Sequence, residues 1–507
     1  MARYKHIDLS PRFLPVVLEA QLIPGSFAHA VHHLVDHLDL SAFDAHFRND
    51  VNGASAYAPS ILLKAVLLAY SQGIISSRAI EYTCRHNVVF IALTGDAKPH
   101  FTTFADFISR SRDAIASVFA QVLSVLGQEG LIGREMFAID GVKLPSNASK
   151  YRAGTRDEFL AQADKLEGLA RKMLDAHGSS DAAGEQTIPD ARVVARITRM
   201  SGEAQKIRTW LTQHPEDRRG PSGKVRKSHL IDNESAKMAT DKGVVQGYCG
   251  AAVVDAAHQV IVEASAFGTG SEQEILMPVL EACADQRTPT TLITADTGYY
   301  SEANLAFLAA SGIEALIPDN RARGRDERQA GREKHTTKKR AMHLQTRGKK
   351  AKPKLFAPED FIIAPDQSYA ICPAGKRLYR TGGHCSIGGY TAVKFRGPKS
   401  ACVGCPLRAQ CLQKPDVTQT RQVAVLTRYK HMEHSQRMRE RIDSEEGRRQ
   451  YAQRLGTVEP VFGNIRHNKR MNRFTLRGQF KVDGQWKLYA IVHNIEKWAH
   501  RHELRDK

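Results

Sequence analysis

Two short apolar segments, far apart in the chain, each run directly into an aspartate. Met136 to Ile139 precedes Asp140, Leu292 to Ala295 precedes Asp296, and a glycine follows each aspartate within two residues. Both apolar segments are predicted to be strands. An aspartate can follow a strand simply because it favours turns. The alternative is that each strand is a rigid arm that holds a carboxylate where chemistry needs it.

The segments around these aspartates alternate between strand and helix patterns. Their periodicity predicts helices at 272–285 and 301–311, and strands at 136–139, 244–255, 259–267, 290–295 and 313–317. This order predicts an α/β core with a mixed sheet. Groups at the carboxyl ends of neighbouring strands converge on the ligand crevice of an open α/β sheet, so Asp140 and Asp296 are expected to meet if their strands are adjacent.

Helical patterns precede the predicted core, in a chain long enough for several domains. Residues 1–130 are predicted to form an all-α N-terminal domain. Its clearest pair is a helix at 60–70, then Gly73, then a second helix that begins at Ser76 and Ser77. Helix, short turn and helix is the outline of a helix-turn-helix DNA reader, and a plain helical hairpin fits the pattern equally well.

Two insertions are predicted to interrupt the core. The first part of the core, residues 131–320, contains a helical hairpin at about 152–215, which begins at a capping box formed by Thr155 and Glu158. Residues 321–440 form a basic and cysteine-rich insertion. Residues 441–507 are predicted to be a C-terminal helical part of the core.

The charge of the chain points to a polyanionic partner. The 507 residues include 73 Lys or Arg and 54 Asp or Glu, which gives a formal charge of +19. Between Arg321 and Lys354, 14 basic residues accompany only three acidic ones. Such a run is usually a solvated segment, and a basic segment also binds phosphate backbones through counterion release. Double-stranded DNA is therefore the leading partner.

Nothing in the sequence suggests a membrane or secretory protein. No run of 18 uncharged apolar residues is long enough to span a bilayer, and Met1 to Ser10 is polar and charged with no apolar segment after it. We therefore expect a cytoplasmic protein whose eight cysteines are reduced thiols or metal ligands rather than disulfides.

A third candidate carboxylate lies far downstream, in the segment YAQRLGTVEPVFGNIR. Counted from Tyr451, the residues Arg454, Glu459 and Arg466 follow at +3, +8 and +15, close to multiples of the helical period. A helix would then show a carboxylate flanked by cations on one face. Pro460 predicts a break or a new helix start beside Glu459.

A metal ion would explain why such carboxylates gather. Two carboxylates that meet repel each other unless a cation lies between them. Mg²⁺ suits this role, because it binds a few carboxylate oxygens and leaves positions for phosphate oxygens and water.

Together these motifs resemble those of the DDE transposases of bacterial insertion sequences. The segment YAPSILLKAVLLAYSQGIISSRAIEYTCRHN also looks like the helical domain that these transposases place ahead of their core. The resemblance rests on Asp140 in AIDGVKLPSNAS, Asp296 in TADTGYY, and the Tyr-x2-Arg-xn-Glu-x6-Lys/Arg signature at Tyr451, Arg454, Glu459 and Arg466. In the commoner form of this signature, three residues rather than four separate Arg from Glu, and the last residue is Lys.

The resemblance implies a ribonuclease-H-like core that uses two Mg²⁺ or Mn²⁺ ions. Asp140 would bridge both ions, and Asp296 and Glu459 would each complete one. Tyr451, Arg454 and Arg466 would orient DNA phosphates. The reaction would be hydrolysis at transposon ends, then strand transfer into target DNA, by an assembly of at least two copies of the chain.

Two other functions fit the same residues. One is a metal-dependent nuclease on the same core that cuts without strand transfer, because only the nucleophile differs. The other is a DNA-binding protein with an inactive site. All three acids are present at the ends of their predicted elements, which favours a catalytic function.

Four cysteines have the character of zinc ligands. Cys402 and Cys405 form a Cys-x2-Cys pair, a spacing that lets both thiolates reach one tetrahedral ion. Buried thiols without metal are the alternative. Cys385 is a candidate substitute ligand, and Cys84, Cys249 and Cys283 lie on apolar stretches and are predicted to be core residues. The predicted structural zinc site consists of Cys372, Cys402, Cys405 and Cys411.

Overall fold

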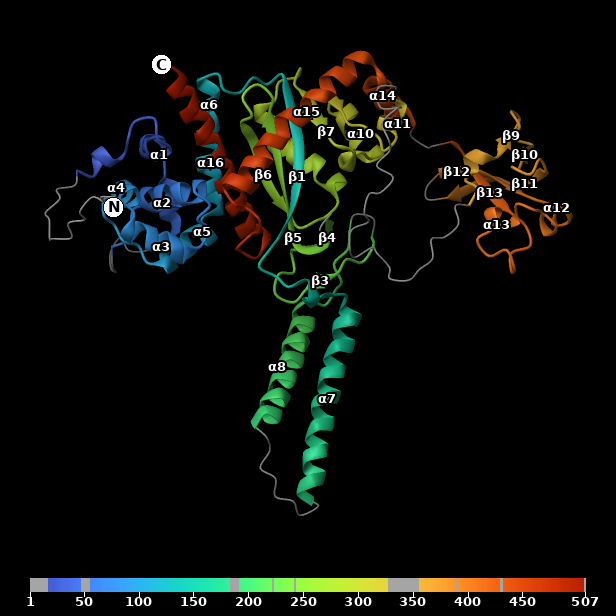
Figure 1. Ribbon diagram of the computed structural model, residues 1–507, viewed down its shortest axis with the longest axis horizontal. Coiled ribbons are helices and arrows are strands. Elements are labelled where there is room, and N and C mark those ends of the chain that lie inside the picture. Colours follow the sequence, from blue (N-terminus) through green and yellow to red (C-terminus); the bar gives the residue numbers. More distant parts are fainter. Residues whose placement is uncertain are drawn as a thin grey trace, which may run out of the picture. The chain divides into compact units, whose positions relative to one another are not determined.

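The computed structural model describes two compact units (Figure 1). The large unit comprises Met1–Tyr300, Ser311–Asn320 and Glu445–Lys507, and the small unit comprises Ser301–Ala310 and Arg321–Ser444. None of the helices in the described part of the chain is long and apolar enough to cross a membrane. The described residues are 17–46, 55–182, 191–220, 223–240, 243–326, 355–387, 390–428 and 432–505.

The large unit is built on a six-stranded mixed sheet with β1 in its middle (Figure 1). On one side, β1 pairs antiparallel with β5, and β5 in turn pairs antiparallel with both β4 and β6. On the other side, β1 pairs parallel with β7, which pairs parallel with β8. The mixed α/β fold predicted from the sequence is confirmed. The strands are β1 (Met136–Pro145), β4 (Ala236–Thr240), β5 (Gly243–Asp255), β6 (Ile261–Phe267), β7 (Leu292–Ala295) and β8 (Ala315–Leu316).

Strand β1 is longer than its apolar segment predicts. Its pairing with β5 continues through Asp140 and Gly141 as far as Pro145, whereas its pairing with β7 ends at Ile139. The predicted strand end at Asp140 is therefore wrong, because the long antiparallel partner β5 keeps the following residues extended. Asp140 marks only the point at which the parallel partner leaves β1.

Two helices were predicted between the later strands of this sheet. The helix predicted at 272–285 is shorter in the structure, where α9 (Leu276–Ala282) has a 3₁₀ turn on each side, at Glu272–Glu274 and Ala284–Gln286. The helix predicted at 301–311 is confirmed as α10 (Glu302–Ala310).

The described residues that precede β1 form helices. Gly73, at φ +71°, ends α2, and Ile74 donates its N–H to the carbonyl of Ala69 at 2.8 Å. The predicted second helix follows, with Ile80 and Cys84 buried as expected, although Ser76 caps it without a side-chain hydrogen bond. These helices are α1 (Phe27–Asp36), α2 (Pro59–Ser71), α3 (Ser77–His86), α4 (Val88–Thr94), α5 (Phe101–Arg110) and α6 (Arg112–Gln128).

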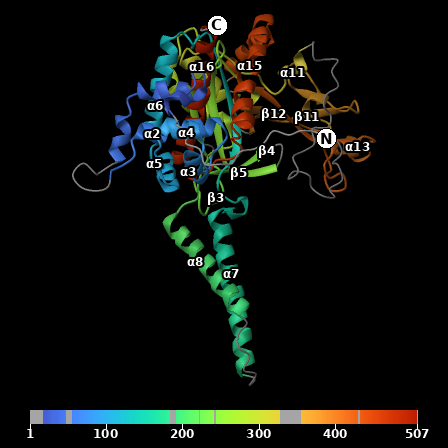
Figure 2. The ribbon, with the colours of Figure 1, turned by 60° about the vertical axis from the view of Figure 1, so that its left-hand side comes forward.

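Two long helices, α7 (Arg156–Ala182) and α8 (Ala191–Gln213), lie side by side (Figure 1 and Figure 2). The capping box is confirmed, since Thr155 donates its N–H to Glu158 Oε2 at 2.9 Å and Glu158 donates its N–H to Thr155 Oγ1 at 3.3 Å. A short pairing of β2 (Ala153–Gly154) with β3 (Ser228–His229) closes the base of the hairpin. Its small core consists of Phe159, Ala163, Ile207, Trp210 and Leu211.

The C-terminal part of the large unit contains α15 (Glu445–Gly463) and α16 (Gln479–Arg505). Contrary to the predicted break, α15 continues through Pro460 and then widens into a π-helical turn at Asn464–Asn468. Proline removes one helical hydrogen bond, but buried Val458 and Val461 pack on both sides of it. Tertiary packing therefore overrides the local preference.

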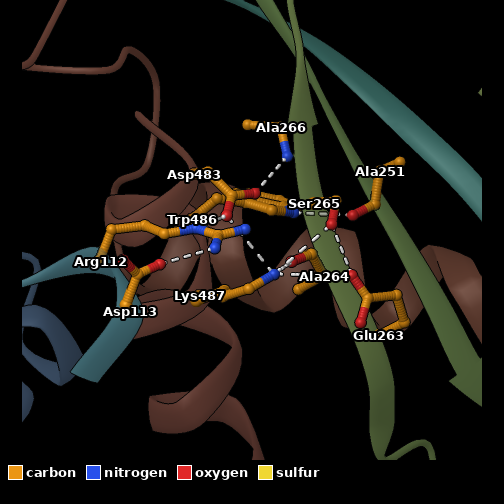
Figure 3. A network of polar contacts seen from close by, with 10 residues as sticks. All are labelled: Arg112, Asp113, Ala251, Glu263, Ala264, Ser265, Ala266, Asp483, Trp486 and Lys487. Carbon is orange, nitrogen blue, oxygen red and sulfur yellow. Dashed lines mark hydrogen bonds and ion pairs between the residues drawn. The ribbon is translucent and has the colours of Figure 1, made fainter. Parts of the chain in front are cut away.

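Helix α16 docks on the sheet through polar contacts (Figure 3). Trp486 donates its indole N–H to the carbonyl of Ala251 at 2.7 Å. Asp483 accepts the N–H of Ala266 at 2.9 Å and the Nε–H of Arg112 from α6 at 2.8 Å. These bonds join β5, β6 and α6 to one turn of α16, so the sheet and the N-terminal helices share a core.

The small unit contains a five-stranded sheet in the order β13-β12-β11-β10-β9. The sequence analysis assigned no strands here. All of its described pairings are antiparallel, around a core of six buried residues that includes Phe361, Leu378 and Phe395. The strands are β9 (Ile362–Ile363), β10 (Tyr369–Ile371), β11 (Arg377–Ile387), β12 (Tyr390–Arg396) and β13 (Gln422–Arg428), and the helices, besides α10, are α11 (Ala322–Arg325), α12 (Lys399–Val403), α13 (Arg408–Cys411) and α14 (Met432–Asp443).

Candidate active site

Asp140 and Asp296 follow the last registered pair of two parallel strands. Ile139 of β1 is the partner of Ala295 of β7, so the two aspartates leave neighbouring strands at the same level. The adjacency that the sequence analysis required is present. Because neighbouring parallel strands end on the same side of a sheet, the two aspartates lie at the same end of the β1·β7 pair.

Both aspartates are also held by local backbone hydrogen bonds. Asp140 Oδ1 accepts the N–H of Gly141 at 2.8 Å. Asp296 Oδ1 accepts the N–H of Gly298 at 2.8 Å and caps the 3₁₀ turn Thr297–Tyr299. Asp296 therefore does form a turn, and the hydrogen bond that closes this turn also holds its carboxylate in place.

The carboxylate of Asp140 lies in a site where negative charge is crowded. Burial raises the pKa of Asp140, while the Arg454 guanidinium and the N–H of Gly141 act in the opposite direction. Asp296 and Glu272 then raise the pKa further, and the balance lies above the ordinary value. The charges that bear on this carboxyl group therefore come from β7, α15 and the turn before α9.

Arg454 forms an ion pair with this carboxylate. It is buried on α15, its Nη2 lies 3.3 Å from Asp140 Oδ1, and it donates a hydrogen bond to the carbonyl of Ile139 at 3.0 Å. Arg454 Nε is buried and has no hydrogen-bond partner within the described residues. The side chain therefore fastens α15 to the end of the β1·β7 pairing.

Lys143 and Glu272 belong to the same site, and sequence analysis missed both. Lys143 Nζ lies 2.9 Å from Glu272 Oε1. A Cβ atom at Gly298 would lie 1.8 Å from Glu272 Oε2 and 2.9 Å from Asp296 Oδ1, so only glycine fits between these carboxylates. Burial lowers the pKa of Lys143, and the hydrogen bond and charge of Glu272 more than reverse this. Lys143 could have been found from the sequence only if the strand had been predicted to continue past Asp140 and Gly141. The sequence around Glu272 contains no signal for a role in the site.

The residues of the downstream signature do not share one helical face. Glu459 is exposed on α15, whereas Arg454 is buried five residues earlier. Five residues turn a helix by about 140° beyond a full turn, which separates the two side chains. Tyr451 is half-buried, and Arg466 lies in the π-helical turn with a buried Nε that has no hydrogen-bond partner in the described ranges. The predicted single face is therefore wrong.

The carboxylates at the edge of the sheet suit a divalent cation in chemical character. The raised pKa of Asp140 reflects burial and nearby negative charge, which a bound cation would relieve. Within the part of the chain that the structure describes, no three or more His, Cys, Asp or Glu side chains are already arranged to hold a metal. Asp140 and Asp296 supply carboxylate oxygens, which are the donors that Mg²⁺ prefers.

The cysteines of the small unit and those of the large unit lie in different surroundings. Cys372, Cys402, Cys405 and Cys411 line one cavity of the small unit, and Cys385, on β11, is not among its lining residues. The core cysteines, Cys84, Cys249 and Cys283, are buried. The basic segment 321–354 lies mostly outside the described residues.

Two family models match the chain. Residues 371–499 match a model described as a transposase DDE domain, and residues 16–110 match one described as a transposase domain (DUF772). The resemblance to DDE-type insertion-sequence transposases is confirmed. The DDE-domain match includes the signature from Tyr451 to Arg466, while Asp140 and Asp296 precede it. No curated protein matches the chain.

Transposase domains at both ends of the chain support a transposase role and imply a DNA substrate. The matched N-terminal residues contain α1 to α5. The DDE-domain match contains part of the small unit together with α15 and most of α16. The sheet edge at Asp140 is thus flanked in sequence by two transposase domains.

Proposed function

We propose that this chain is a DDE transposase that cleaves DNA at the ends of its element and joins them to target DNA. The observation that carries the proposal is the register of Ile139 with Ala295, which sets Asp140 and Asp296 side by side. Together with the transposase family matches, a carboxylate pair at the end of parallel strands supports metal-dependent phosphoryl transfer.

Asp140, Asp296 and Glu459 would hold two Mg²⁺ or Mn²⁺ ions. Bound there, the metal supplies activation of a water or a DNA 3′-hydroxyl and neutralises charge on the leaving oxygen. Glu459 is exposed and so can meet DNA or solvent. Glu272 already acts on the charge of Asp140 and is the alternative third carboxylate.

The protein's own cations position these carboxylates. Arg454 holds the Asp140 carboxylate and the carbonyl of Ile139 together, which keeps the end of the β1·β7 pair closed against α15. Lys143 forms an ion pair with Glu272. Tyr451, Arg454 and Arg466 would orient phosphates once DNA is bound, and each is a donor of the kind that phosphoryl transfer requires.

The core that carries this chemistry would be ribonuclease-H-like. Support comes from the sheet, in which β1 lies between an antiparallel set (β5, β4 and β6) and a parallel set (β7 and β8). The helices α15 and α16 then return to the same sheet from the C-terminal part of the chain. Helix α15 carries Glu459, whose side chain is exposed.

DNA would be bound by basic surfaces outside the catalytic carboxylates. The helix pair α2–α3 exposes Tyr82, and Arg85 beside it pairs with Glu81 at 2.7 Å. This helix pair would bind DNA as a helix-turn-helix, and the basic segment 321–354 would bind the phosphate backbone. Transposition at two ends would need at least two copies of the chain.

Cleavage of a labelled duplex that carries an end of the element, with Mg²⁺ present, tests this function. Asp140→Ala and Asp296→Ala are expected to abolish cutting and to leave salt-dependent binding intact. Asp106→Ala is the matched control, because this aspartate is exposed and forms an ion pair with Arg110, which is exposed too. Equal cutting by all three variants would refute the catalytic role of the pair.

The products separate the competing functions. DNA joined to a target identifies a transposase, and cut ends without joined DNA identify a nuclease on the same core. Binding without any cutting by the wild-type chain, with its metal supplied, would identify an inactive DNA-binding protein.

A further inference from the structure

Four cysteines from three segments of the small unit meet at one cavity of about 30 Å³. Cys372 follows β10, Cys402 lies in α12, Cys405 follows that helix and Cys411 ends α13. A cavity of this size holds about one or two water-sized particles. The other lining residues include Leu378, Ala401 and Leu412, so thiols are its main soft donors.

A backbone N–H points to one of these thiols. The N–H of Lys376 points to Cys372 Sγ at 3.4 Å, across a tight turn that contains Gly375 at φ +72°.

The cavity is also lined by cations. Arg408 and Arg421 both border it, as does Lys376. Arg421 Nε is buried and has no hydrogen-bond partner within the described residues. Four thiolates around one Zn²⁺ carry a net charge of −2, and these cations would offset that charge.

The sheet of the small unit has a small apolar core. That core contains six buried residues, against which Cys372 and Cys411 pack. A sheet with so small a core usually depends on a metal or on disulfides. The eight cysteines are all free in the structure.

We propose that Cys372, Cys402, Cys405 and Cys411 bind one structural Zn²⁺ that braces the small unit. The Cys402-x2-Cys405 pair supplies two ligands from one turn, and Cys372 and Cys411 supply the other two across the cavity. Among the described residues no three such side chains are yet arranged around a metal, so binding turns the Sγ atoms into the cavity that they share.

Metal analysis of the full-length chain, purified without chelator, tests this site. The wild type is expected to carry about one zinc per chain, and Cys402→Ser and Cys411→Ser to lose it. Cys385→Ser is the matched control, because this cysteine lies on β11 and is absent from the cavity lining. It is expected to keep its zinc.

Cobalt substitution supplies a second measurement that needs no variant. Co²⁺ in the site should give intense thiolate charge-transfer absorption with tetrahedral ligand-field bands. A wild-type chain without zinc that also fails to bind Co²⁺ in this way overturns the proposal. Zinc that survives Cys402→Ser, or two disulfides found by counting free thiols in denaturant, overturns it as well.

Discussion

Arg454 on α15 and Asp140 on β1 form an ion pair at the end of the β1·β7 pairing. The two side chains approach to 3.3 Å, and the same guanidinium donates to the carbonyl of Ile139. One arginine thus joins a helix from the C-terminal part of the chain to the carboxylate that the first strand carries. The arrangement explains how residues so distant in sequence are brought to one site.

Replacing Arg454 is expected to destabilise the large unit. Arg454→Ala leaves Asp140 without its cation and Ile139 without a hydrogen-bond donor, and we expect a loss of about 2 to 3 kcal/mol in the free energy of unfolding. Denaturant unfolding measures it. The Asp140→Ala, Arg454→Ala double variant should lose less than the sum of the single losses; a strictly additive result would show that the ion pair is not coupled.

The third carboxylate of the site can be identified by comparing two glutamate-to-glutamine variants. Glu459→Gln is expected to lower the rate of DNA cleavage by about 10³-fold or more, as loss of a directly acting group does. Glu272→Gln is expected to lower it by about 10- to 100-fold, because Glu272 is engaged with Lys143 and supports the site from outside. Single-turnover cleavage rates decide. The reverse order of effects would make Glu272 the ligand.

A methyl group at Gly250 should disturb the docking of α16. A Cβ atom there would lie 2.9 to 3.1 Å from the buried ring of Trp486, which cannot move without breaking its bond to Ala251. Gly250→Ala is expected to cost about 1 to 3 kcal/mol in stability. Gly168→Ala on α7, where no atom lies within 4 Å, should be neutral or stabilising by up to about 1 kcal/mol. Similar thermal midpoints for the two variants would contradict this.

His493 should make the large unit sensitive to acid. It is fully buried, its Nε2 lies 2.9 Å from the carbonyl of Gln259, and its Nδ1 lies 3.3 Å from the side-chain amide of Asn464. Burial lowers the pKa of His493 to about 3, and the charges of Lys497 and Lys469 lower it too. The stability that neutral His493 contributes to the folded state is fully present above the unfolded pKa of about 6.5, and it is lost as the pH falls towards 3.

Each pKa unit corresponds to about 1.36 kcal/mol. The free energy of unfolding should therefore fall by about 2 kcal/mol between pH 7.5 and pH 5 because of His493. Unfolding free energies at the two values measure the loss. His493→Gln keeps an amide donor and does not titrate, so its loss over the same interval should be smaller by that amount. An identical loss in both proteins would exclude His493 as the source.

Local patterns in the sequence predicted much of this protein. The apolar segments before Asp140 and Asp296, the capping box at Thr155 and Glu158, and the cysteines of the small unit were all recognisable. Each depends on spacing or on neighbours along the chain, which a sequence displays directly. The order of the other strands and helices in this part of the large unit followed from the same signals, whereas β4 was not predicted.

Contacts between distant segments decided the rest. Pairing with β5 kept Asp140 to Pro145 extended, and packing carried α15 through Pro460. The exposure of Glu459 beside buried Arg454, and the ion pair of Lys143 with Glu272, depend on partners far away in sequence. Local preferences are small compared with the free energy of burial and strand pairing, so only the tertiary structure could settle them.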